Sequence, residues 1–459
     1  MTRGEAGETI AAISTPLGEA GIGIVRLSGP AAESIARRLF RPYRPRPRWR
    51  SHRLYLGHFL DSQGRVLDEV LLTLMRAPHS YTREDVVEIH CHSGYAVLRA
   101  VLGAVLAEGA RLARPGEFTL RAFLSGRLDL TQAEAVLEVI QARTQASLRV
   151  AAAHLAGGLG RRLGELRASL LGILARIEAA LDFPEEAEEV SPEALEEGLT
   201  AARRHLEELL ATYRQGRLLR EGLEVVLAGR PNVGKSSLLN RLLDADRAIV
   251  TDIPGTTRDV IEEAITLDGV ALRLSDTAGL REARDPVEEL GVARSQERLA
   301  RADLIIYLVD GSQPLAEEDV QILRQLAGRP GLVAVNKIDL PRQLNLQDLR
   351  RCSSYPKVEI SALSGQGLEE LKKALVDLAL GGGLRPEGDL ITQARHHELL
   401  ARAQEALGRG EELLGRPELP WELVALEVRE ALQALGEITG EEVGDAVLEQ
   451  IFSQFCLGK

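Results

Sequence analysis

The sequence predicts a multidomain fold that combines α/β and all-helical parts, in which one helical domain is interrupted by an inserted α/β domain. Short strand-like and helix-like runs alternate over residues 1–118. Apolar residues recur at helical spacing over 119–216 and again over 384–459, whereas strand-like runs followed by turns fill residues 217–383. The simplest account is that 119–216 and 384–459 pack together, because the inserted domain leaves from and returns to the same helical domain.

The first part, residues 1–118, is predicted to be an α/β unit. Val- and Ile-rich runs predict strands at 9–15, 21–28, 66–75 and 85–93, and helical periodicity predicts helices at 32–40 and 95–110.

Residues 41–53 carry six arginines with Tyr43 and Trp49 among them. This composition suits phosphates and stacked bases. It also suits an exposed, proline-rich connector whose arginines are solvated. Both interpretations stay open at this point.

The helical parts differ in one detail. Residues 117–216 are helical throughout except for an acidic, proline-containing break at 182–192, which we expect to be a surface loop. Helical periodicity resumes at Leu390, after the glycine-rich stretch that begins at 381.

The run Gly229–Ser236, GRPNVGKS, lies between an apolar strand-like segment at 223–228 and a helix-like one at 237–243. This is the context of a phosphate-binding P-loop, in which backbone N–H groups surround the β-phosphate, Lys235 reaches the β- and γ-phosphates, and the Ser236 hydroxyl ligates Mg²⁺. The other residues of the predicted phosphate site are Asn232, Val233, Gly234 and Ser237.

Three further motifs follow strand-like runs in the order typical of a Ras-like P-loop G domain. The Asp339 carboxylate can accept two hydrogen bonds from guanine, for which adenine has no matching donor pair, so we expect GTP rather than ATP. Lys337 is expected to lie over the base and Asn336 to meet its far edge. The residues of these motifs are Asp276, Thr277, Ala278 and Gly279; Asn336, Lys337, Ile338 and Asp339; and Ser361, Ala362 and Leu363.

One position departs from the Ras-like pattern. Leu280 follows the DTAG motif, where Ras-like proteins have a glutamine that orients the attacking water. Glu282, Glu288 and Glu289 are the nearby candidates for that role. The segment expected over the γ-phosphate, with Thr257 as a second Mg²⁺ ligand, contains Thr251, Asp252, Ile253, Pro254, Gly255, Thr256 and Thr257.

Composition excludes several classes of protein. A formal net charge of −12 argues against indiscriminate nucleic-acid binding, although it allows a local basic patch. Cys91, Cys352 and Cys456 form no CxxC pair, which excludes a disulfide framework or zinc ribbon. No apolar run approaches membrane-spanning length and no signal-peptide pattern opens the chain, so we expect a cytoplasmic protein without membrane contact.

With these motifs in view, the chain resembles the MnmE (TrmE) family of tRNA modification GTPases over essentially its full length. The resemblance rests on GIGIVRLSG, ARPGEFTLRAFLSGRLDLTQAEA, GRPNVGKSSLLN, TDIPGTTRD, DTAGLRE and the C-terminal FCLGK. It implies that the chain acts with the flavoprotein MnmG. Together they would add an aminomethyl or carboxymethylaminomethyl group to carbon five of the wobble uridine of certain tRNAs, taking the carbon from 5-formyl- or methylene-tetrahydrofolate. It also implies a homodimer, formed through a folate-binding N-terminal domain, and a heterotetramer with MnmG.

The resemblance also implies roles for particular residues. Folate contacts fall on Arg26, Glu88, Arg127 and Lys459. A potassium ion that replaces an arginine finger would be held by Asn232, Thr251, Ile253 and Thr256. The catalytic glutamate aligns with Glu288, not Glu282.

Cys456 leaves two interpretations open. Its thiolate could add to carbon six of the uridine and activate carbon five, or the residue could be a small buried hydrophobe after Phe452 and Phe455.

Two consequences follow for testing. A folate pocket that includes both Arg26 and Lys459 requires the C-terminal tail to return to the N-terminal domain, within one chain or across a dimer. The alternative function is a regulatory GTPase of ribosome assembly that binds RNA without carbon transfer. Because such a GTPase has no use for folate, folate binding discriminates between the two.

Overall fold

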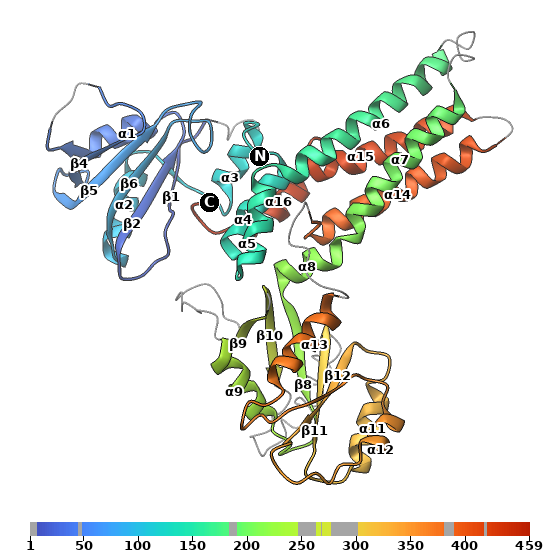
Figure 1. Ribbon diagram of the computed structural model, residues 1–459. Coiled ribbons are helices and arrows are strands. Elements are labelled where there is room, and N and C mark those ends of the chain that lie inside the picture. Colours follow the sequence, from blue (N-terminus) through green and yellow to red (C-terminus); the bar gives the residue numbers. More distant parts are fainter. Residues whose placement is uncertain are drawn as a thin grey trace, which may run out of the picture.

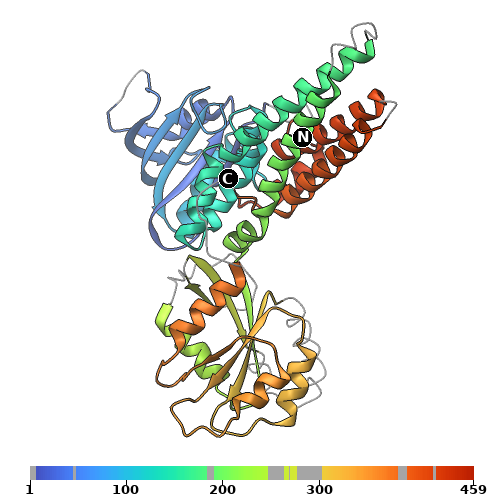
Figure 2. The same cartoon turned by 45° about the vertical axis from the view of Figure 1, so that its right-hand side comes forward.

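The computed structural model describes residues 7–44, 48–182, 191–246, 263–267, 269–276, 302–380, 390–416 and 420–459. These residues form a first sheet domain, an elongated helical part and a second sheet domain (Figure 1). The turned view in Figure 2 shows the second sheet domain joined to one end of the helical part. In both views the C-terminus lies where the first sheet domain meets the helices.

The first sheet domain contains a seven-stranded sheet in the order β3-β4-β5-β6-β2-β1-β7. Ile35 of α1 and Leu98 of α2 are fully buried in one core with the strand residues Leu72 and Ile89. The two helices therefore cover one face of the sheet. The elements are β1 (Ile10–Ile13), β2 (Ala20–Ser28), α1 (Ala32–Leu39), β3 (Phe40–Pro42), β4 (Arg53–Leu60), β5 (Val66–Met75), β6 (Val86–Ser93), α2 (Tyr95–Ala107) and β7 (Arg111–Leu112).

Strand β4 was not among the predicted strands, and its position changes the interpretation of the arginine-rich segment. It pairs with β3 and β5, so the chain between β3 and β4 is a connection within the sheet. Trp49 is 4% exposed and packs against the rings of Phe40 and Tyr55. Stacking of a nucleic-acid base on Trp49 is therefore excluded, because the core already covers the ring.

The helical part is built on a four-helix core. Helices α6, α7, α14 and α15 share one cluster of buried residues, so helices from both sides of the second sheet domain pack together. In α6 the buried residues Leu159, Leu163, Leu166 and Leu170 recur at helical spacing. The elements are α3 (Glu117–Leu124), α4 (Leu130–Gln141), α5 (Gln145–Leu155), α6 (Gly158–Asp182), α7 (Pro192–Ala211), α8 (Tyr213–Glu221), α14 (Ala394–Leu414), α15 (Trp421–Thr439) and α16 (Asp445–Ser453).

Local sequence explains where several of these helices begin. The Asp129 side chain accepts from the Gln132 N–H and the Gln132 side-chain oxygen accepts from the Asp129 N–H, a capping box that starts α4. Ser191 caps α7 just before Pro192, which needs no N–H partner in the first turn. Within the described ranges, no helix has the length and apolarity required to cross a membrane.

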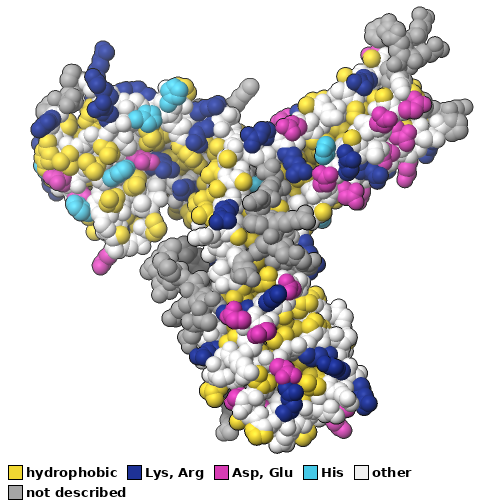
Figure 3. All heavy atoms as spheres, in the orientation of Figure 1, with side chains coloured by type: hydrophobic (Ala, Val, Ile, Leu, Met, Phe, Trp, Pro, Cys, Tyr) yellow, Lys and Arg dark blue, Asp and Glu magenta, His cyan; other side chains and the backbone are white. Residues whose placement is uncertain are grey.

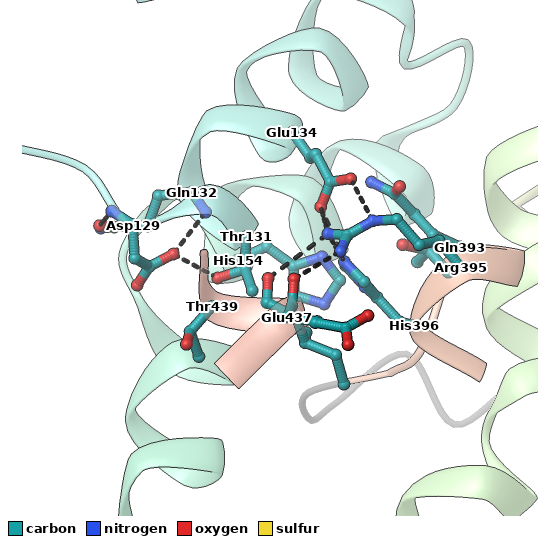
Figure 4. A network of polar contacts seen from close by, with 12 residues as sticks. Asp129, Thr131, Gln132, Glu134, His154, Gln393, Arg395, His396, Glu437 and Thr439 are labelled. Carbon is teal, nitrogen blue, oxygen red and sulfur yellow. Dashed lines mark hydrogen bonds and ion pairs between the residues drawn. The ribbon is translucent and has the colours of Figure 1, made fainter. Parts of the chain in front are cut away.

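Two buried carboxylates of α4, Glu134 and Glu138, hold the chain where it returns from the second sheet domain. Glu134 accepts from Arg395 and His396, with a shortest distance of 2.7 Å to His396 Nε2 (Figure 4). Glu138 accepts from Thr392 at 2.7 Å and from His154 at 3.2 Å. Burial raises the pKa of Glu134, but the charges and hydrogen bonds of His396 and Arg395 outweigh it and hold that pKa below its usual value.

The second sheet domain contains a six-stranded sheet in the order β13-β12-β11-β8-β10-β9. Leu238 of α9 and Leu371 of α13 are buried in one cluster with the sheet, and Leu323 of α11 and Leu349 of α12 in another. Helices thus cover both faces (Figure 1). The elements are β8 (Leu223–Ala228), α9 (Lys235–Asp246), β9 (Glu263–Leu267), β10 (Val270–Asp276), β11 (Leu304–Asp310), α11 (Glu317–Gln325), β12 (Gly331–Asn336), α12 (Leu346–Cys352), β13 (Lys357–Glu359) and α13 (Leu368–Leu380).

The predicted domain boundaries do not coincide with ends of elements. The boundary at 118 falls inside α3 and the boundary at 216 falls inside α8. The third, at 383, lies outside the described residues.

Candidate functional site

The predicted phosphate loop joins β8 to α9 at the carboxyl end of β8, a central strand of the second sheet. Strands β8, β10, β11, β12 and β13 run parallel, so the segments that follow them meet at their carboxyl ends. Asp276 is the last residue of β10, Asn336 is the last residue of β12, and Ser361 follows β13 by two residues. The fold therefore brings parts of all four predicted motifs together at the carboxyl ends of the parallel strands.

Two glycines of the loop have no room for a side chain. A Cβ on Gly229, whose φ is +144°, would lie 2.6 Å from the Leu308 carbonyl oxygen. A Cβ on Gly234, whose φ is +101°, would lie 2.2 Å from Asn336 Nδ2. Asn232 also has a left-handed backbone, with φ 62°. Left-handed residues within such a loop are part of the backbone pattern that turns successive N–H groups toward an anion.

Lys235 lies inside this loop, with only 6% of its surface exposed. Its Nζ donates to the carbonyl oxygens of Gly229 at 2.8 Å and Arg230 at 2.7 Å. The loop thus wraps around a positive charge at the position where phosphates are expected. Val233 anchors the loop in the core, being 3% exposed, and Ser236 and Ser237 lie in the first turn of α9.

Asn336 connects the phosphate loop to the segment at 361–363. Its Nδ2 donates to the Val233 carbonyl at 2.8 Å, and its Oδ1 accepts from the Ala362 N–H at 2.9 Å. The side chain is buried. The sequence predicts Asn336 at the far edge of the guanine ring; in this structure its amide ties two loops together, and a contact with the base stays a prediction.

Lys337 and Asp339 follow on the same loop. Lys337 has a left-handed backbone, with φ 65°, and its Nζ lies 2.7 Å from Asp310 Oδ2. Burial raises the pKa of Asp310, but the contacts with Lys337 and Ser312 outweigh burial and hold that pKa below its usual value. The carboxyl therefore stays ionised and pairs with the lysine. Asp339 is exposed, and none of the hydrogen bonds and ion pairs found in the described ranges uses its carboxylate. That carboxylate is therefore accessible to a base.

The remaining base-pocket residues surround this position. The Ile338 N–H donates to the Ile360 carbonyl at 3.3 Å, which fixes the loop against the end of β13. Ser361 and Ala362 are buried, whereas Leu363 is 81% exposed.

One buried contact of the phosphate loop is not predictable from the motifs. The Asp319 carboxylate, which is fully buried, accepts from Arg230 Nε at 2.9 Å and from the Tyr307 hydroxyl at 2.9 Å. Arg230 lies within the GRPNVGKS motif, so this contact fixes the loop from the side of α11. No pattern in the sequence links residues 230 and 319, because only the packing of α11 on the sheet brings them together.

Several predicted residues lie outside the described part of the chain, and their roles stay predictions. They are Thr251, Asp252, Ile253, Pro254, Gly255, Thr256, Thr257, Thr277, Ala278, Gly279, Glu282, Glu288 and Glu289.

A second group of predicted residues meets at the first sheet domain. Arg26 on β2 and Glu88 on β6 face each other across paired strands, and the Arg26 Nη2 lies 2.8 Å from Glu88 Oε1. The C-terminal tail lies against this pair. The Gly458 carbonyl accepts from Arg26 Nη1 at 3.3 Å and from the Ser14 hydroxyl at 3.2 Å, all within one chain.

The end of the tail is fixed by its backbone. The Phe118 N–H donates to the Lys459 carbonyl at 3.2 Å, and Gly458 has φ +90°. Burial and the nearby Arg26 charge lower the pKa of the Lys459 side chain. The nearby Glu88 carboxylate acts in the opposite direction and only partly offsets these two effects.

Tyr81 links the fourth predicted residue to this group. The Arg127 guanidinium lies over the Tyr81 ring at 4.8 Å from its centroid, and the Arg26 guanidinium lies at 5.7 Å from the same centroid. Arg26 and Arg127 therefore share one aromatic ring, which no sequence pattern indicated. Glu88 and Lys459 are connected to this group through Arg26, which pairs with Glu88 and lies near the Lys459 side chain. The hydrogen bond from His90, together with Arg26, holds the pKa of Glu88 below its usual value despite burial.

Cys456 is exposed at the start of the tail. The interpretation as a buried hydrophobe is therefore wrong for this structure, because Phe452 and Phe455 fill the core without it. Its proposed nucleophilic role stays a prediction. Over the described residues, no group of three or more His, Cys, Asp or Glu side chains is arranged to hold a metal ion.

The fold and the first site define the class: a P-loop protein that binds GTP, with an additional sheet domain and a split helical domain. Comparison with known proteins identifies the family. Residues 9–127 match the family described as GTP-binding protein TrmE N-terminus, and residues 130–456 match the MnmE helical domain. The chain belongs to the MnmE family of tRNA modification GTPases, as its motifs predicted.

Relatives match over almost the full length. A protein of Geobacillus kaustophilus (strain HTA426) named tRNA modification GTPase MnmE is 49% identical over 460 residues, which cover 98% of this chain and 99% of that one. A protein of the same name from Chloroflexus aurantiacus (strain ATCC 29366 / DSM 635 / J-10-fl) is 51% identical over 454 residues, covering 98% of this chain and 100% of that one.

Proposed function

We propose that the chain hydrolyses GTP in a reaction cycle that modifies the wobble uridine of certain tRNAs. With the flavoprotein MnmG, it adds an aminomethyl or carboxymethylaminomethyl group to carbon five, and the added carbon comes from 5-formyl- or methylene-tetrahydrofolate. The observation that supports this proposal is the contact of the C-terminal tail with Arg26. It brings the end of the chain beside the Arg26–Glu88 pair, and Arg26 shares the Tyr81 ring with Arg127.

The charges of this group suit a folate. Arg26, Arg127 and Lys459 are positive, and a folate carries carboxylates on its glutamate tail. Glu88 can accept hydrogen bonds from the amino edge of the pterin. Because Glu88 already pairs with Arg26 at 2.8 Å, it also orients that guanidinium. Cys456, exposed beside Lys459, is proposed as the nucleophile toward the uridine.

In the GTP site, Lys235 exchanges its two carbonyl partners for phosphate oxygens, and the Asp339 carboxylate accepts from the guanine edge. Ser236 and Thr257 would hold Mg²⁺, and Asn232, Thr251, Ile253 and Thr256 would hold K⁺. These ions supply positive charge against the charge that develops on the phosphates. Glu288 is proposed to position the attacking water.

The proposed organisation has four parts: residues 1–118 bind folate and form the homodimer, 119–216 and 384–459 form the helical domain, and 217–383 form the G domain. The homodimer would join MnmG as a heterotetramer in the cytoplasm. Support for the split helical domain comes from the buried cluster shared by α6, α7, α14 and α15.

Isothermal titration with 5-formyl-tetrahydrofolate tests the one-carbon part of the proposal. The wild-type chain is expected to bind, and Glu88→Gln is expected to weaken binding roughly tenfold or more, the effect of one charged hydrogen bond. Glu69→Gln is the matched control, because Glu69 is an exposed strand carboxylate that pairs with the Tyr43 hydroxyl. A wild-type chain that binds GTP but no folate would contradict the proposal and favour a regulatory GTPase.

GTP turnover in potassium and sodium salts tests the cation part. Turnover is expected to be fast in K⁺ and slow in Na⁺ at equal ionic strength, and Asn232→Ala is expected to remove the difference. Equal turnover of the wild-type chain in both salts would refute the K⁺ assignment.

A further inference from the structure

A cavity of about 690 Å³ opens on the first sheet domain beside the proposed folate site. It is lined by His52, Met75, Pro78, His79, Ser80, Tyr81, Arg83 and Arg127. All four ionisable groups other than the tyrosine are of the cationic types, and no carboxylate is among these eight residues. In a chain with 68 acidic and 56 basic residues, such a lining favours an anionic ligand.

The backbone of this cavity has an unusual feature. Four non-glycine residues in the described ranges have a left-handed backbone: His52, Arg83, Asn232 and Lys337. Asn232 and Lys337 belong to the GTP site, and His52 and Arg83 both line this cavity, with φ 58° and 59°. A left-handed backbone is strained for a non-glycine residue and persists only where the surrounding structure holds it. Such residues are enriched at active sites and ligand sites.

Two contacts show how the cationic groups are held. Arg83 Nη1 donates to the Ser125 carbonyl at 2.8 Å, and Arg127 lies over the Tyr81 ring. The first contact ties the 80–85 loop to the segment that precedes α4. Both arginines are exposed, so their remaining donors can reach a ligand.

Tyr81 is also the boundary between the two sites. Tyr81 lines the cavity, and its ring centroid also lies 5.7 Å from the Arg26 guanidinium of the proposed folate site. A chain-like ligand held in the cavity would therefore extend toward Arg26, Glu88 and the tail that carries Cys456.

We propose that this cavity binds the phosphate backbone of a single-stranded RNA segment and leads its target base to the one-carbon site. The proposal rests on the proposed function, which requires tRNA to reach that site. Arginine and histidine suit phosphates, whereas the shape of an open cavity suits a flexible strand better than a rigid helix. On the face shown in Figure 3, acidic side chains gather on the helical part, whereas few of them are seen on the first sheet domain, so a polyanion meets less repulsion on the first sheet domain.

Fluorescence anisotropy with a labelled anticodon stem-loop RNA tests this proposal on the full-length protein. Arg83→Gln and His79→Gln are the test variants, because neither residue belongs to the proposed folate or GTP sites. Arg65→Gln is the matched control: Arg65 lies in the turn between β4 and β5, its side chain is 72% exposed, and it pairs with Asp61. Folate titration and GTP binding of each variant report on folding.

We expect Arg83→Gln to weaken RNA binding roughly tenfold at low salt, as for loss of one charge-assisted hydrogen bond. The slope of log K against log salt should fall by about 0.7 for each phosphate contact that is lost from a single strand. His79→Gln should also weaken RNA binding, because it removes the imidazole from the cavity lining. The folate affinity of both test variants should equal that of the wild type, and the RNA affinity of Arg65→Gln should also equal that of the wild type.

Unchanged RNA affinity and salt slope in both test variants would overturn the proposal. Weaker folate binding with unchanged RNA binding would also overturn it and assign the cavity to folate. If the wild-type protein itself fails to bind the RNA, the proposed function fails as well. This outcome is distinguishable from failure of the cavity proposal, in which the wild type binds RNA and the variants bind it equally well.

Discussion

Substitution of Gly458 by alanine should separate the two proposed activities of this chain. Gly458 has φ +90°, and a Cβ there would lie 2.4 Å from the Ile13 carbonyl oxygen and 2.8 Å from the Ser14 Cα. Both atoms belong to the backbone of the first sheet domain, so neither can turn aside. The tail cannot keep its present position with alanine at 458.

The size of the effect follows from these contacts. A left-handed alanine costs roughly 1–2 kcal/mol. This strain exists only in the docked tail, so it shifts the equilibrium between docked and released tail toward release by roughly 5- to 30-fold, and the overlap with the two backbone atoms adds to it. Release also breaks the hydrogen bonds from Arg26 and Ser14 to the Gly458 carbonyl.

The assay combines three measurements on Gly458→Ala. Hydrogen exchange at the Phe118 amide, which donates to the Lys459 carbonyl, should accelerate as the tail leaves. Titration with 5-formyl-tetrahydrofolate should show weaker binding. GTP hydrolysis and helical content should remain, because the P-loop and the base pocket lie in the second sheet domain.

Gly444→Ala is the matched control in the same C-terminal segment. Gly444 has φ −78°, and a Cβ there meets no atom within 4 Å. This variant should behave as the wild type in all three measurements. Full folate affinity in Gly458→Ala, with a released tail, would refute the shared folate pocket, and loss of GTP hydrolysis would show that the tail supports the G domain instead.

Three further predictions concern other parts of the chain. Asp339→Asn should weaken GTP binding at least roughly 100-fold and favour xanthosine triphosphate, since an amide can donate to the xanthine carbonyl; competition binding of the two nucleotides measures this. Iodoacetamide at pH 8 should modify the exposed Cys456 and spare Cys91, whose pKa burial raises to about 11, as peptide mass spectrometry would show. Arg395→Ala should destabilise the helical part by about 3–5 kcal/mol, because the buried Glu134 loses its bidentate partner; circular dichroism during urea unfolding measures it.

The lowered pKa of Glu134 gives the last of these predictions a pH dependence. A carboxyl whose pKa is lower in the folded chain stabilises it above the ordinary glutamate value of 4.5, and this contribution is lost as pH falls through the lower folded value. The difference between the wild type and Arg395→Ala should therefore shrink in acid. A difference that stays constant between pH 7 and pH 3 would contradict the assigned role of Glu134.

The parts of the fold that local pattern controls could be predicted from the sequence. The phosphate loop needs glycines at fixed positions between a strand and a helix. In α6 the helical spacing of the leucines indicates which face of the helix is buried. The return of the tail to Arg26 could be inferred only through the family resemblance, which placed the two ends of the chain in one pocket.

The missed features depend on contacts between distant segments. Strand β4 begins at Arg53, the last residue of the arginine-rich segment, and its strand character becomes evident only through pairing with β5. Trp49 is buried because α1 and β4 close over it, which no local pattern indicates. Asp319 resembles an ordinary acidic residue of a helix first turn until the fold places Arg230 beside it.

The central claim is that this chain takes part in modifying the wobble uridine of tRNA. Nucleoside mass spectrometry of tRNA from a strain lacking the chain's gene, with the wild-type gene or an empty vector returned, tests it most directly. The account predicts aminomethyl- or carboxymethylaminomethyl-uridine at the wobble position with the gene and unmodified or partly modified uridine without it. Identical wobble nucleosides in both strains, with the chain expressed and hydrolysing GTP, would contradict the claim.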